Sequence, residues 1–502
     1  MATVRRTDLQ CSPTRRTGSV ALRGSLRAAR PVALVAATVF ALAAQTSGDQ
    51  LARQVCNLVQ TYERTSTATV GVSIRHLPSG PEPLSIRGGD LFIPASCQKL
   101  LTAAAALERL GGAFQFTTSV YVSGSDMVVI GDFDPTLGDP RIAQQQGISI
   151  YHELDRWARA VAERVGQTPV ESLLLVTDGS VRTYRHPDWP VRQHQRWFGA
   201  PPSELNFHNN CLDVSFRVKG RSATASVTPS SRFIRIDSRV KVAKRHVWSL
   251  KTGSDLSVVK LAGSVSRSTP DPLSVAIDDP AALLGRVLAD RLARHGVNLT
   301  GQIRSVKGDQ VDRSGASLVC QTKTPIELVL RRANKRSSNL AAECLFLRAG
   351  DGTWAGSAAI ATQTLTKRYG LDPKGFRICD GSGLSRKARV APSTLTELLA
   401  GLVRRSEGDK LIDSLPKSGI DGTMVNRLSS GKYRGRVLAK TGSLAGVSGL
   451  AGYVLDSSGT PAVAYAILIN GVGAKDTGKT RALQDAVCRA LVDSLEANPQ
   501  SN

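Results

Sequence analysis

Aromatic residues are scarce in this chain and make up only 5% of its 502 residues. No nucleic-acid-binding motif accompanies them, so we expect no nucleic-acid partner. The eight cysteines also lack a metal-binding spacing such as C-x-x-C. We therefore expect neither a metal nor another cofactor.

Long apolar runs are also missing, with one exception at residues 31–44. That run has 14 residues, whereas a membrane-spanning helix needs about 20. Seven arginines precede it and small residues end it, which indicates an export signal at 1–44, cleaved near Ala43 or Ala44. We expect an exported protein, periplasmic or otherwise extracytoplasmic. Because the basic segment is long, an uncleaved anchor stays open as an alternative.

Acidic residues are outnumbered: 41 Asp and Glu stand against 65 Lys and Arg, which gives a formal net charge of +24. Residues 1–44 supply +6 of that charge and the rest of the chain +18. A basic exterior suits anionic polymers. A peripheral association with a membrane or a cell wall is therefore left open.

Three short elements stand in a fixed order along the chain. They are Ser96-Cys97-Gln98-Lys99, Ser337-Ser338-Asn339 and Lys440-Thr441-Gly442, which follow the patterns S-x-x-K, S-x-N and K-T-G. Together they are typical of a serine acyl-transfer site. Such a site supplies a nucleophile, a base, a proton relay and a carboxylate anchor without a histidine or a metal.

Each pattern alone is weak, because S-x-x-K occurs five times and K-T-G twice. The copies at Ser238 and Ser257 lie in alternating, strand-like sequence, where positions i and i+3 face opposite sides. The copy at Ser414 contains a proline, and the copy at Ser429 reads as a turn. The K-T-G copy at Lys251 precedes the only S-x-N and so breaks the order.

Ser96 has the sequence setting of a nucleophile. An apolar run follows it and stops at Gly111, which predicts a helix with Ser96 in its first turn. The positive end of a helix favours a developing negative charge. Lys99, three residues on, projects from the same face and can act as the base. A free lysine has a pKa of about 10.4, so burial and the charge of Lys440 would have to keep Lys99 neutral.

The two ends of the chain read as mixed helix and strand, whereas residues from about 170 to 276 read mainly as short strands. Ser96 and Ser337 are 241 positions apart, more than a compact acyl-transfer domain needs, and the sequence shows no internal repeat or long linker. We expect an α+β protein with a catalytic domain at 45–135 and 277–496, interrupted by one or more β-rich inserted domains at 136–276.

The chain resembles the class C low-molecular-mass penicillin-binding proteins, which are exported serine D-alanyl-D-alanine carboxypeptidases and endopeptidases. The resemblance covers most of the mature chain. It rests on the following segments: 94–103 around the nucleophile, Asp134-Pro135-Thr136-Leu137, 337–343, Asp380-Gly381-Ser382-Gly383-Leu384-Ser385-Arg386, 419–423 and 437–444. It implies an antiparallel sheet flanked by helices, as in β-lactamases and transpeptidases, with a large insertion.

The resemblance implies peptidoglycan stem peptides as substrates and β-lactam antibiotics as covalent inhibitors. Ser96 would attack the penultimate D-alanine, Ser337 would relay the proton to the leaving amine, and Asn339 would hold a substrate amide. The substrate carboxylate would be bound by Lys440, Thr441, Gly442 and Ser443. The backbone N–H groups of Ser96 and Ser443 would form the oxyanion hole. The Asp380–Arg386 and Asp421–Thr423 segments are interpreted as architectural turns.

The chain departs from the family pattern in three places, one of which is the stretch from Trp189 to Cys211, which is richer in Trp, His and Asn than expected. Asp132 and Phe133 stand where the family commonly has glycines, so that turn should differ. Cys97 replaces a commoner threonine or serine and is interpreted as a small buried side chain.

Three other functions stay open. A β-lactamase shares the three elements, but the nearest match to its deacylating loop, Glu204-Leu205-Asn206, has the wrong spacing. A catalytically silent wall-binding protein would keep the fold without the chemistry. A secreted esterase is a weaker alternative, because it does not need the K-T-G carboxylate anchor.

Overall fold

The computed structural model describes residues 49–497, apart from 78, 79, 81, 83, 178–184, 254 and 313. The expected export signal and its cleavage site lie outside the described residues. The chain forms two compact units. Among the described residues, one holds those up to Cys97, Tyr369–Arg377 and those from Arg389 on; the other holds those of Gln98–Arg368 and Ile378–Ala388. Within the described ranges, no helix is both long and apolar enough to cross a bilayer.

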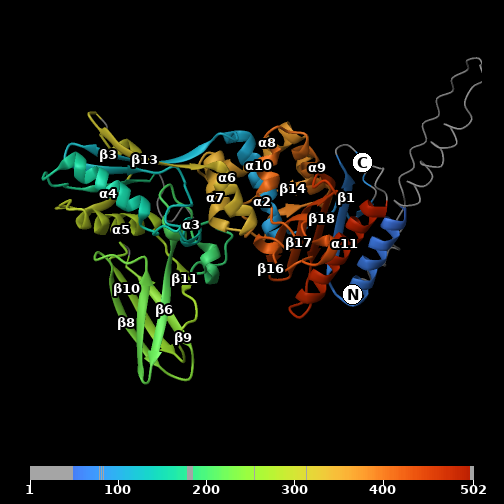
Figure 1. Cartoon of the computed structure of the whole chain (residues 1–502), viewed down its shortest axis with the longest axis horizontal. Coiled ribbons are helices and arrows are strands. Elements are labelled where there is room, and N and C mark those ends of the chain that lie inside the picture. The colour runs from blue at the N-terminus through green and yellow to red at the C-terminus, as the bar shows by residue number, and fades with distance from the viewer. Residues whose placement is uncertain are drawn as a thin grey trace, which may run out of the picture. The chain divides into compact units, whose positions relative to one another are not determined.

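The first unit is built on a five-stranded antiparallel sheet whose order is β16-β17-β18-β1-β2. Its strands come from both ends of the chain: β1 (Thr69–His76), β2 (Leu84–Ile86), β16 (Val437–Leu444), β17 (Val447–Leu455) and β18 (Pro461–Asn470). In β1 and β18, Thr69 lies opposite Asn470 and His76 opposite Val463. The sheet is therefore complete only when the last strands pair with the first (Figure 1).

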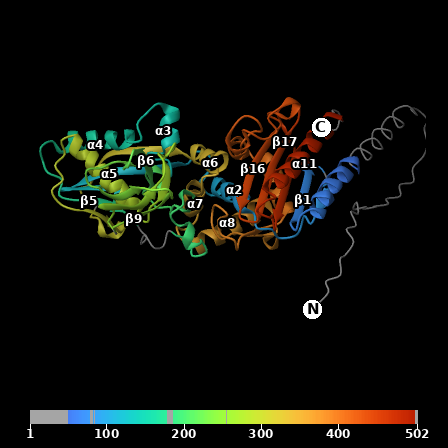
Figure 2. The same cartoon turned by 90° about the horizontal axis from the view of Figure 1, so that it is seen from below.

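Helices cover both faces of this sheet, as the alternation of side chains along β1 shows. Val70, Val72 and Ile74 belong to one core with α11 (Thr477–Ala497) and the helix over residues 49–64. Figures 1 and 2 both show these two helices side by side. On the other face, the Ser73 hydroxyl lies 2.7 Å from that of Thr396 on α9 (Pro392–Val403).

The second unit contains a mixed five-stranded sheet with the order β12-β5-β4-β3-β13. Its strands are β3 (Gln115–Ser123), β4 (Asp126–Ile130), β5 (Leu173–Val176), β12 (Ile303–Val306) and β13 (Ser317–Pro325). The pairs β12–β5 and β5–β4 are parallel, whereas β4–β3 and β3–β13 are antiparallel. The amphipathic helices α4 (His152–Val165) and α5 (Pro280–Arg294) share its core.

Two three-stranded sheets belong to the same unit. One consists of β8 (Arg235–Val242), β10 (Val258–Val265) and β9 (Val247–Thr252), and the other of β11 (Leu273–Ala276), β6 (Cys211–Lys219) and β7 (Ser222–Thr228). Residues of both sheets, such as Leu212, Phe216, Val259 and Leu261, join the core of the five-stranded sheet. A single hydrophobic core therefore links all three sheets of this unit.

The helices of the second unit include α2 (Gln98–Leu110), α6 (Ile326–Lys335) and α7 (Asn339–Ala349), which pack against one another. The helix predicted after Ser96 is thus present, and it ends where predicted, because Gly111 adopts a left-handed φ of 82°. In α2, every residue from Gln98 to Leu107 is buried. Such a helix is held by packing on several sides rather than by one apolar stripe.

The α+β fold class predicted from the sequence is confirmed. The short strands predicted between 170 and 276 are present, but β12 and β13, which follow that range, were not predicted as strands of the same sheet. These two strands join β3, β4 and β5 in one sheet. Strands on both sides of the expected domain boundaries at 135/136 and 276/277 therefore share a sheet, and those boundaries stay a prediction.

Candidate active site

The Ser96 turn lies in the first unit, just before α2. Ser96 is the middle residue of a short 3-10 turn, η1 (Ala95–Cys97), and not part of the first α-helical turn as predicted. The difference arises at Ala95, whose φ of 47° falls in the left-handed region and bends the chain there. The chain before the turn is held by Asn470 on β18, whose side chain exchanges hydrogen bonds of 2.8 and 3.1 Å with the backbone of Ile93.

The K-T-G strand packs directly against the Ser96 turn. A Cβ on Gly442 would lie 2.7 Å from the carbonyl oxygen of Pro94 and 3.2 Å from Sγ of Cys97. Only glycine leaves room for such an approach. Cys97 is fully buried, as predicted, and its thiol donates a hydrogen bond of 3.5 Å to the carbonyl oxygen of Lys440. Two motifs 343 positions apart in sequence are thus brought together in one unit.

Lys440 is fully buried on β16, and its amine donates a hydrogen bond of 2.8 Å to the carbonyl oxygen of Thr441. Burial lowers the pKa of Lys440 to about 8. The hydroxyl of Thr441 donates to that of Thr423 at 2.9 Å. The 421–423 segment, interpreted from sequence as an architectural turn, thus also contacts the K-T-G strand.

Lys99 lies in the second unit, in the first turn of α2, and is fully buried. Its amine donates hydrogen bonds to Oδ1 of Asn339 at 2.7 Å and to the carbonyl oxygen of Ser382 at 2.9 Å. The structure therefore brings together the lysine of S-x-x-K and the asparagine of S-x-N. The contact with Ser382 was missed in the sequence, because a backbone carbonyl has no residue signature.

The S-x-N element forms the loop between α6 and α7. Ser338, rather than Ser337, is the N-cap of α7, and its hydroxyl accepts a hydrogen bond of 3.3 Å from the backbone N–H of Ala341. Ser337 has a φ of 54°. A non-glycine residue held in that region is strained, and such residues concentrate at functional sites. Asn339 is fixed at both ends of its amide, because Nδ2 also donates to the carbonyl oxygen of Phe198 at 2.8 Å.

A buried carboxylate supports the Ser382 turn. Both oxygens of Glu343 accept backbone hydrogen bonds, from Gly381 at 2.6 Å and from Ser382 at 2.9 Å. Burial raises the pKa of Glu343 to about 8, and the charge of Asp380 adds to this effect. Asp380 in turn accepts hydrogen bonds from the backbone of Gly383 and from the indole of Trp189. The 380–386 segment thus positions the carbonyl group that receives the Lys99 amine.

A model of the D-Ala-D-Ala carboxypeptidase 3 (S13) family matches residues 51–491. The chain belongs to this family. The match spans the three motifs as well as the sequence between them. The family suggested by the sequence motifs is therefore confirmed.

Curated relatives agree with this assignment. The chain is 27% identical over 455 residues to the D-alanyl-D-alanine carboxypeptidase DacB of Haemophilus influenzae, covering 86% of this chain and 90% of that protein. It is 28% identical over 458 residues to the D-alanyl-D-alanine carboxypeptidase of Actinomadura sp., covering 85% of this chain and 81% of the relative.

Solved structures show the same fold. Penicillin binding protein 4 (dacB) of H. influenzae matches with a TM-score of 0.72 and 24% identity, over 88% of this chain and 99% of that chain. The same protein has also been solved in complex with a β-lactam, and that structure matches with a TM-score of 0.68 and 23% identity, over 87% and 99% of the two chains.

The turn in which this S13 chain departs from the family pattern keeps a glycine-like conformation. Phe133, at one of the expected glycine positions, has a φ of 63°. Its backbone N–H donates to the carbonyl oxygen of Glu204. The neighbouring Asn206 donates to the carbonyl oxygen of Asp134 at 3.1 Å. The Glu204–Asn206 segment, the nearest match to a β-lactamase loop, thus packs on this turn.

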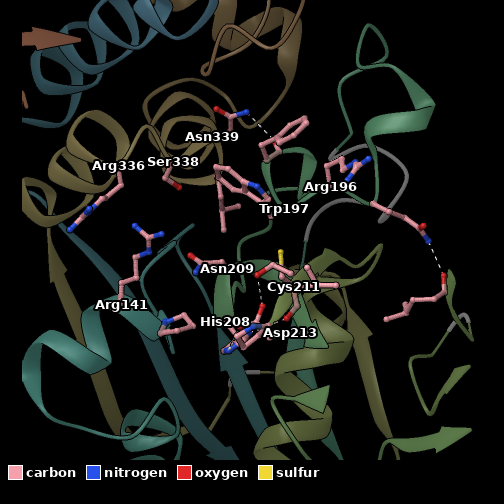
Figure 3. Close-up of a pocket in the computed structure, with 18 of the residues that line it drawn as sticks. Arg141, Arg196, Trp197, His208, Asn209, Cys211, Asp213, Arg336, Ser338 and Asn339 are labelled. Carbon is pink, nitrogen blue, oxygen red and sulfur yellow. Dashed lines mark hydrogen bonds and ion pairs between the residues drawn. The ribbon is translucent and has the colours of Figure 1, made fainter. Parts of the chain in front are cut away.

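A cavity of about 1020 Å³ opens beside Ser338 and Asn339, entirely within the second unit (Figure 3). Five arginines are among its lining residues, namely Arg141, Arg192, Arg196, Arg332 and Arg336. Trp197 and Phe198 form an aromatic part of the wall. This cavity was not predicted from the sequence, because its lining residues come from six separate segments of the chain.

Proposed function

We propose that Ser96 is the nucleophile of an exported DD-peptidase that cleaves the D-Ala-D-Ala bond of peptidoglycan stem peptides. Family membership gives the reaction class, and the motifs give the residues. The observation that carries the proposal is the packing of the Ser96 turn against the Lys440–Gly442 strand through Cys97 and Gly442. A nucleophile next to a buried cation matches a substrate that ends in a carboxylate.

In the proposed first step, Oγ of Ser96 attacks the carbonyl carbon of the penultimate D-alanine and its proton passes to Lys99. The bond to the terminal D-alanine breaks, and Ser337 relays the proton to the leaving amine. Water then hydrolyses the acyl-enzyme. The backbone N–H groups of Ser96 and Ser443 stabilise the oxyanion, and losing one such donor typically costs about 100- to 1,000-fold in rate.

The substrate carboxylate is bound by Lys440, Thr441, Gly442 and Ser443 in this proposal. Lys440 supplies positive charge as long as it is protonated, and Thr441 and Ser443 supply hydroxyl groups. Asn339 holds the Lys99 amine with Oδ1 and contacts a substrate amide. A β-lactam carries a carboxylate and a reactive carbonyl in a similar arrangement, so we expect it to acylate Ser96.

The chain is proposed to act outside the cytoplasm, where its cell-wall substrate lies. The predicted export signal at 1–44 supports this location. The net charge of +24 also suits a peripheral association with an anionic wall or membrane surface. Assays with linear and with cross-linked peptide substrates distinguish an enzyme that trims terminal D-alanine from one that cuts cross-links.

The test is labelling with a fluorescent penicillin, followed by intact mass measurement, on the wild type, Ser96→Ala and Ser238→Ala. Ser238 is the matched control, since it belongs to another S-x-x-K copy and is exposed on β8. We expect a stable adduct on the wild type and on Ser238→Ala, and none on Ser96→Ala.

Other outcomes would favour the alternatives. Rapid penicillin turnover without a lasting adduct would indicate a β-lactamase. Binding of wall material by a folded wild-type protein that neither forms an adduct nor turns over penicillin would favour the silent wall-binding protein.

A further inference from the structure

The arginine-lined cavity beside the S-x-N loop holds more positive charge than its acidic neighbours balance. Arg332 is largely buried and forms an ion pair with the buried Asp139. Arg141 and Arg336 are both exposed, and neither forms an ion pair or side-chain hydrogen bond within the described part of the chain. The cavity thus presents two guanidinium groups without an acidic partner.

The three guanidinium groups lie close enough to repel one another. Burial lowers the pKa of Arg332, whereas the charge of Asp139 raises it. The positive charges of Arg141 and Arg336 lower this pKa further. Figure 3 shows Arg141 and Arg336 on the same side of the cavity. Like charges gathered around an open cavity are stabilised when an anion enters between them.

Part of the cavity wall is a loop with a strained backbone. His208, Asn209 and Asn210 have consecutive positive φ values of 53°, 55° and 54°, which is a costly conformation for three non-glycine residues. The buried side chain of Asn210 anchors the loop with two hydrogen bonds. It donates one to the carbonyl oxygen of Pro201 at 2.8 Å and accepts one from the backbone N–H of Phe207 at 3.1 Å. This leaves the Asn209 side chain on the cavity wall.

The cavity is connected to the proposed catalytic residues. Asn339 lines it and also accepts the hydrogen bond from Lys99. Phe198, on the aromatic wall, accepts the other hydrogen bond of the Asn339 amide. A molecule in the cavity would therefore touch the same loop that the proposed reaction uses.

We propose that this cavity binds a carboxylate-bearing peptide segment of the wall substrate, with carboxylates paired to Arg141, Arg332 and Arg336 and an amide bound by Asn209. The planar guanidinium group matches a carboxylate in two parallel hydrogen bonds. A volume of about 1020 Å³ fits several residues rather than a single small anion. This inference rests on the proposed function, since it assigns the cavity to a remote part of the same substrate.

The binding test uses the full chain carrying Ser96→Ala, so that no turnover interferes. An acidic stem-type peptide with two free carboxylates and its fully amidated form are titrated by calorimetry. We expect the acidic peptide to bind at least about tenfold more tightly, and the double variant Arg141→Gln/Arg336→Gln to remove the difference. Arg221→Gln, at an exposed turn between β6 and β7, is the control and should keep the difference.

The kinetic test compares kcat/KM for D-Ala-D-Ala substrates with and without the additional carboxylates. In the double variant the ratio of the two values should fall about tenfold relative to Arg221→Gln. Equal ratios in both variants, or tight binding of a polyphosphate with no preference for the acidic peptide, would overturn the proposal. Failure of penicillin to label the wild type would instead contradict the proposed function, so the two failures are distinguishable.

Discussion

Asn339 shows how much of the proposed chemistry depends on one side chain. Its Oδ1 accepts from the Lys99 amine at 2.7 Å and its Nδ2 donates to the carbonyl oxygen of Phe198 at 2.8 Å. Leaving a buried donor without its hydrogen-bond partner costs about 1–3 kcal/mol. Asn339→Ala should therefore slow acylation by penicillin by about 10- to 100-fold, measured by stopped-flow labelling.

The neighbouring Ser338 provides the comparison. Its hydroxyl caps α7, and the loss of an N-cap costs about 1 kcal/mol of stability. Ser338→Ala should lower the free energy of unfolding by that amount and slow acylation less than Asn339→Ala does. If both variants slowed acylation equally, the Lys99–Asn339 contact would not be the cause.

Lys440 gives a prediction about pH. Burial lowers its pKa to about 8, so the amine is charged below that pH and loses its proton as the pH rises through it. Because the charged form anchors the substrate carboxylate, KM for a D-Ala-D-Ala peptide should rise above pH 8.

Lys440→Arg tests the cause of that rise, since arginine keeps its charge at any accessible pH. In this variant KM should depend less on pH between 7 and 10, whatever its absolute value. A wild-type KM that stays flat over this range would show that the Lys440 charge does not bind the carboxylate.

At the scale of elements, the closest fit is between β16 and η1. A Cβ on Gly442 would lie 2.7 Å from the carbonyl oxygen of Pro94, closer than real contacts allow. Gly442→Ala should therefore displace the Ser96 turn, lower stability by about 1–3 kcal/mol and reduce penicillin labelling. Thermal unfolding and labelling rates measure the two effects.

Gly478 is a matched control for this substitution, since an added Cβ there meets nothing within 4 Å in the first turn of α11. Gly478→Ala should leave labelling unchanged and stabilise the helix by up to about 1 kcal/mol. Normal labelling of Gly442→Ala would show that the turn tolerates displacement.

Among the elements, those with a side-chain signature could be predicted from the sequence. The apolar run after Ser96 predicted α2, and the strand-like sequence from about 170 to 276 predicted the short strands of that region. β12 and β13 could not be predicted in the same way, because their burial is irregular and their partners β5 and β3 lie more than a hundred residues away. Tertiary pairing, rather than local preference, forms these strands.

The same limit applies within the site. The hydroxyl, amine and amide groups of Ser96, Lys99 and Asn339 could be found from motif spacing. The carbonyl groups of Ser382 and Phe198 could not, since every residue carries one. The cavity arginines were also missed, because only the folded loops bring Arg141 and Arg336 near Arg332.

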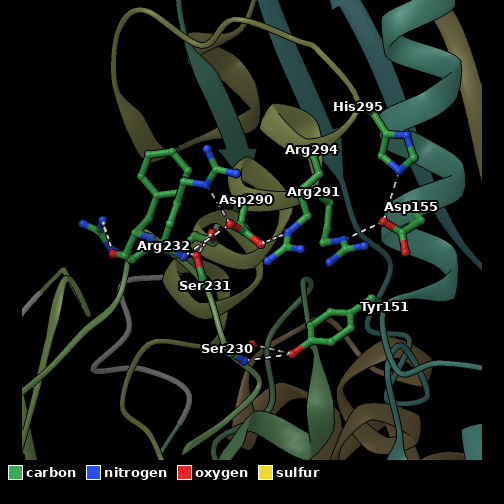
Figure 4. A network of polar contacts seen from close by, with 11 residues as sticks. Tyr151, Asp155, Ser230, Ser231, Arg232, Asp290, Arg291, Arg294 and His295 are labelled. Atoms are coloured by element: carbon green, nitrogen blue, oxygen red, sulfur yellow. Dashed lines mark hydrogen bonds and ion pairs between the residues drawn. The ribbon is translucent and has the colours of Figure 1, made fainter.

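At the scale of the whole molecule, charged networks hold parts of the second unit together. Asp290 on α5 is almost fully buried and accepts hydrogen bonds from Arg232 at 2.9 Å and from Arg294 at 2.8 Å (Figure 4). Nearby, Arg291 of the same helix pairs with Asp155 on α4 at 2.5 Å. These contacts tie α5 to α4 and to the segment that leads into β8.

Burial alone would raise the pKa of Asp290, but the hydrogen bonds and charges of Arg294 and Arg232 outweigh it, so the pKa is lowered overall. A carboxyl group whose pKa is lowered on folding stabilises the protein fully at pH values above the unfolded pKa of 3.8. This stabilisation is lost as the pH falls from there through the lowered pKa. Asp290→Asn should therefore cost about 1–3 kcal/mol at pH 7, and less at pH 3. Urea unfolding at the two pH values measures this.

Asp237→Asn is the control, since Asp237 pairs at 3.7 Å with an Arg239 side chain that is 80% exposed. Pairs of this kind contribute about 0–1 kcal/mol. An equal loss in both variants would show that burial of Asp290 is unimportant.

The pairing of β1 with β18 has a consequence for biosynthesis. A ribosome makes the chain from its N-terminus, so β1 and Ser96 emerge several hundred residues before the strands that flank and support them. Until β16, β17 and β18 have been synthesised, β1 has only the three residues of β2 beside it and the Ser96 turn has no strand to pack against. The Ser96 turn therefore gains the strands that support it only late in synthesis, once residue 470 has been made.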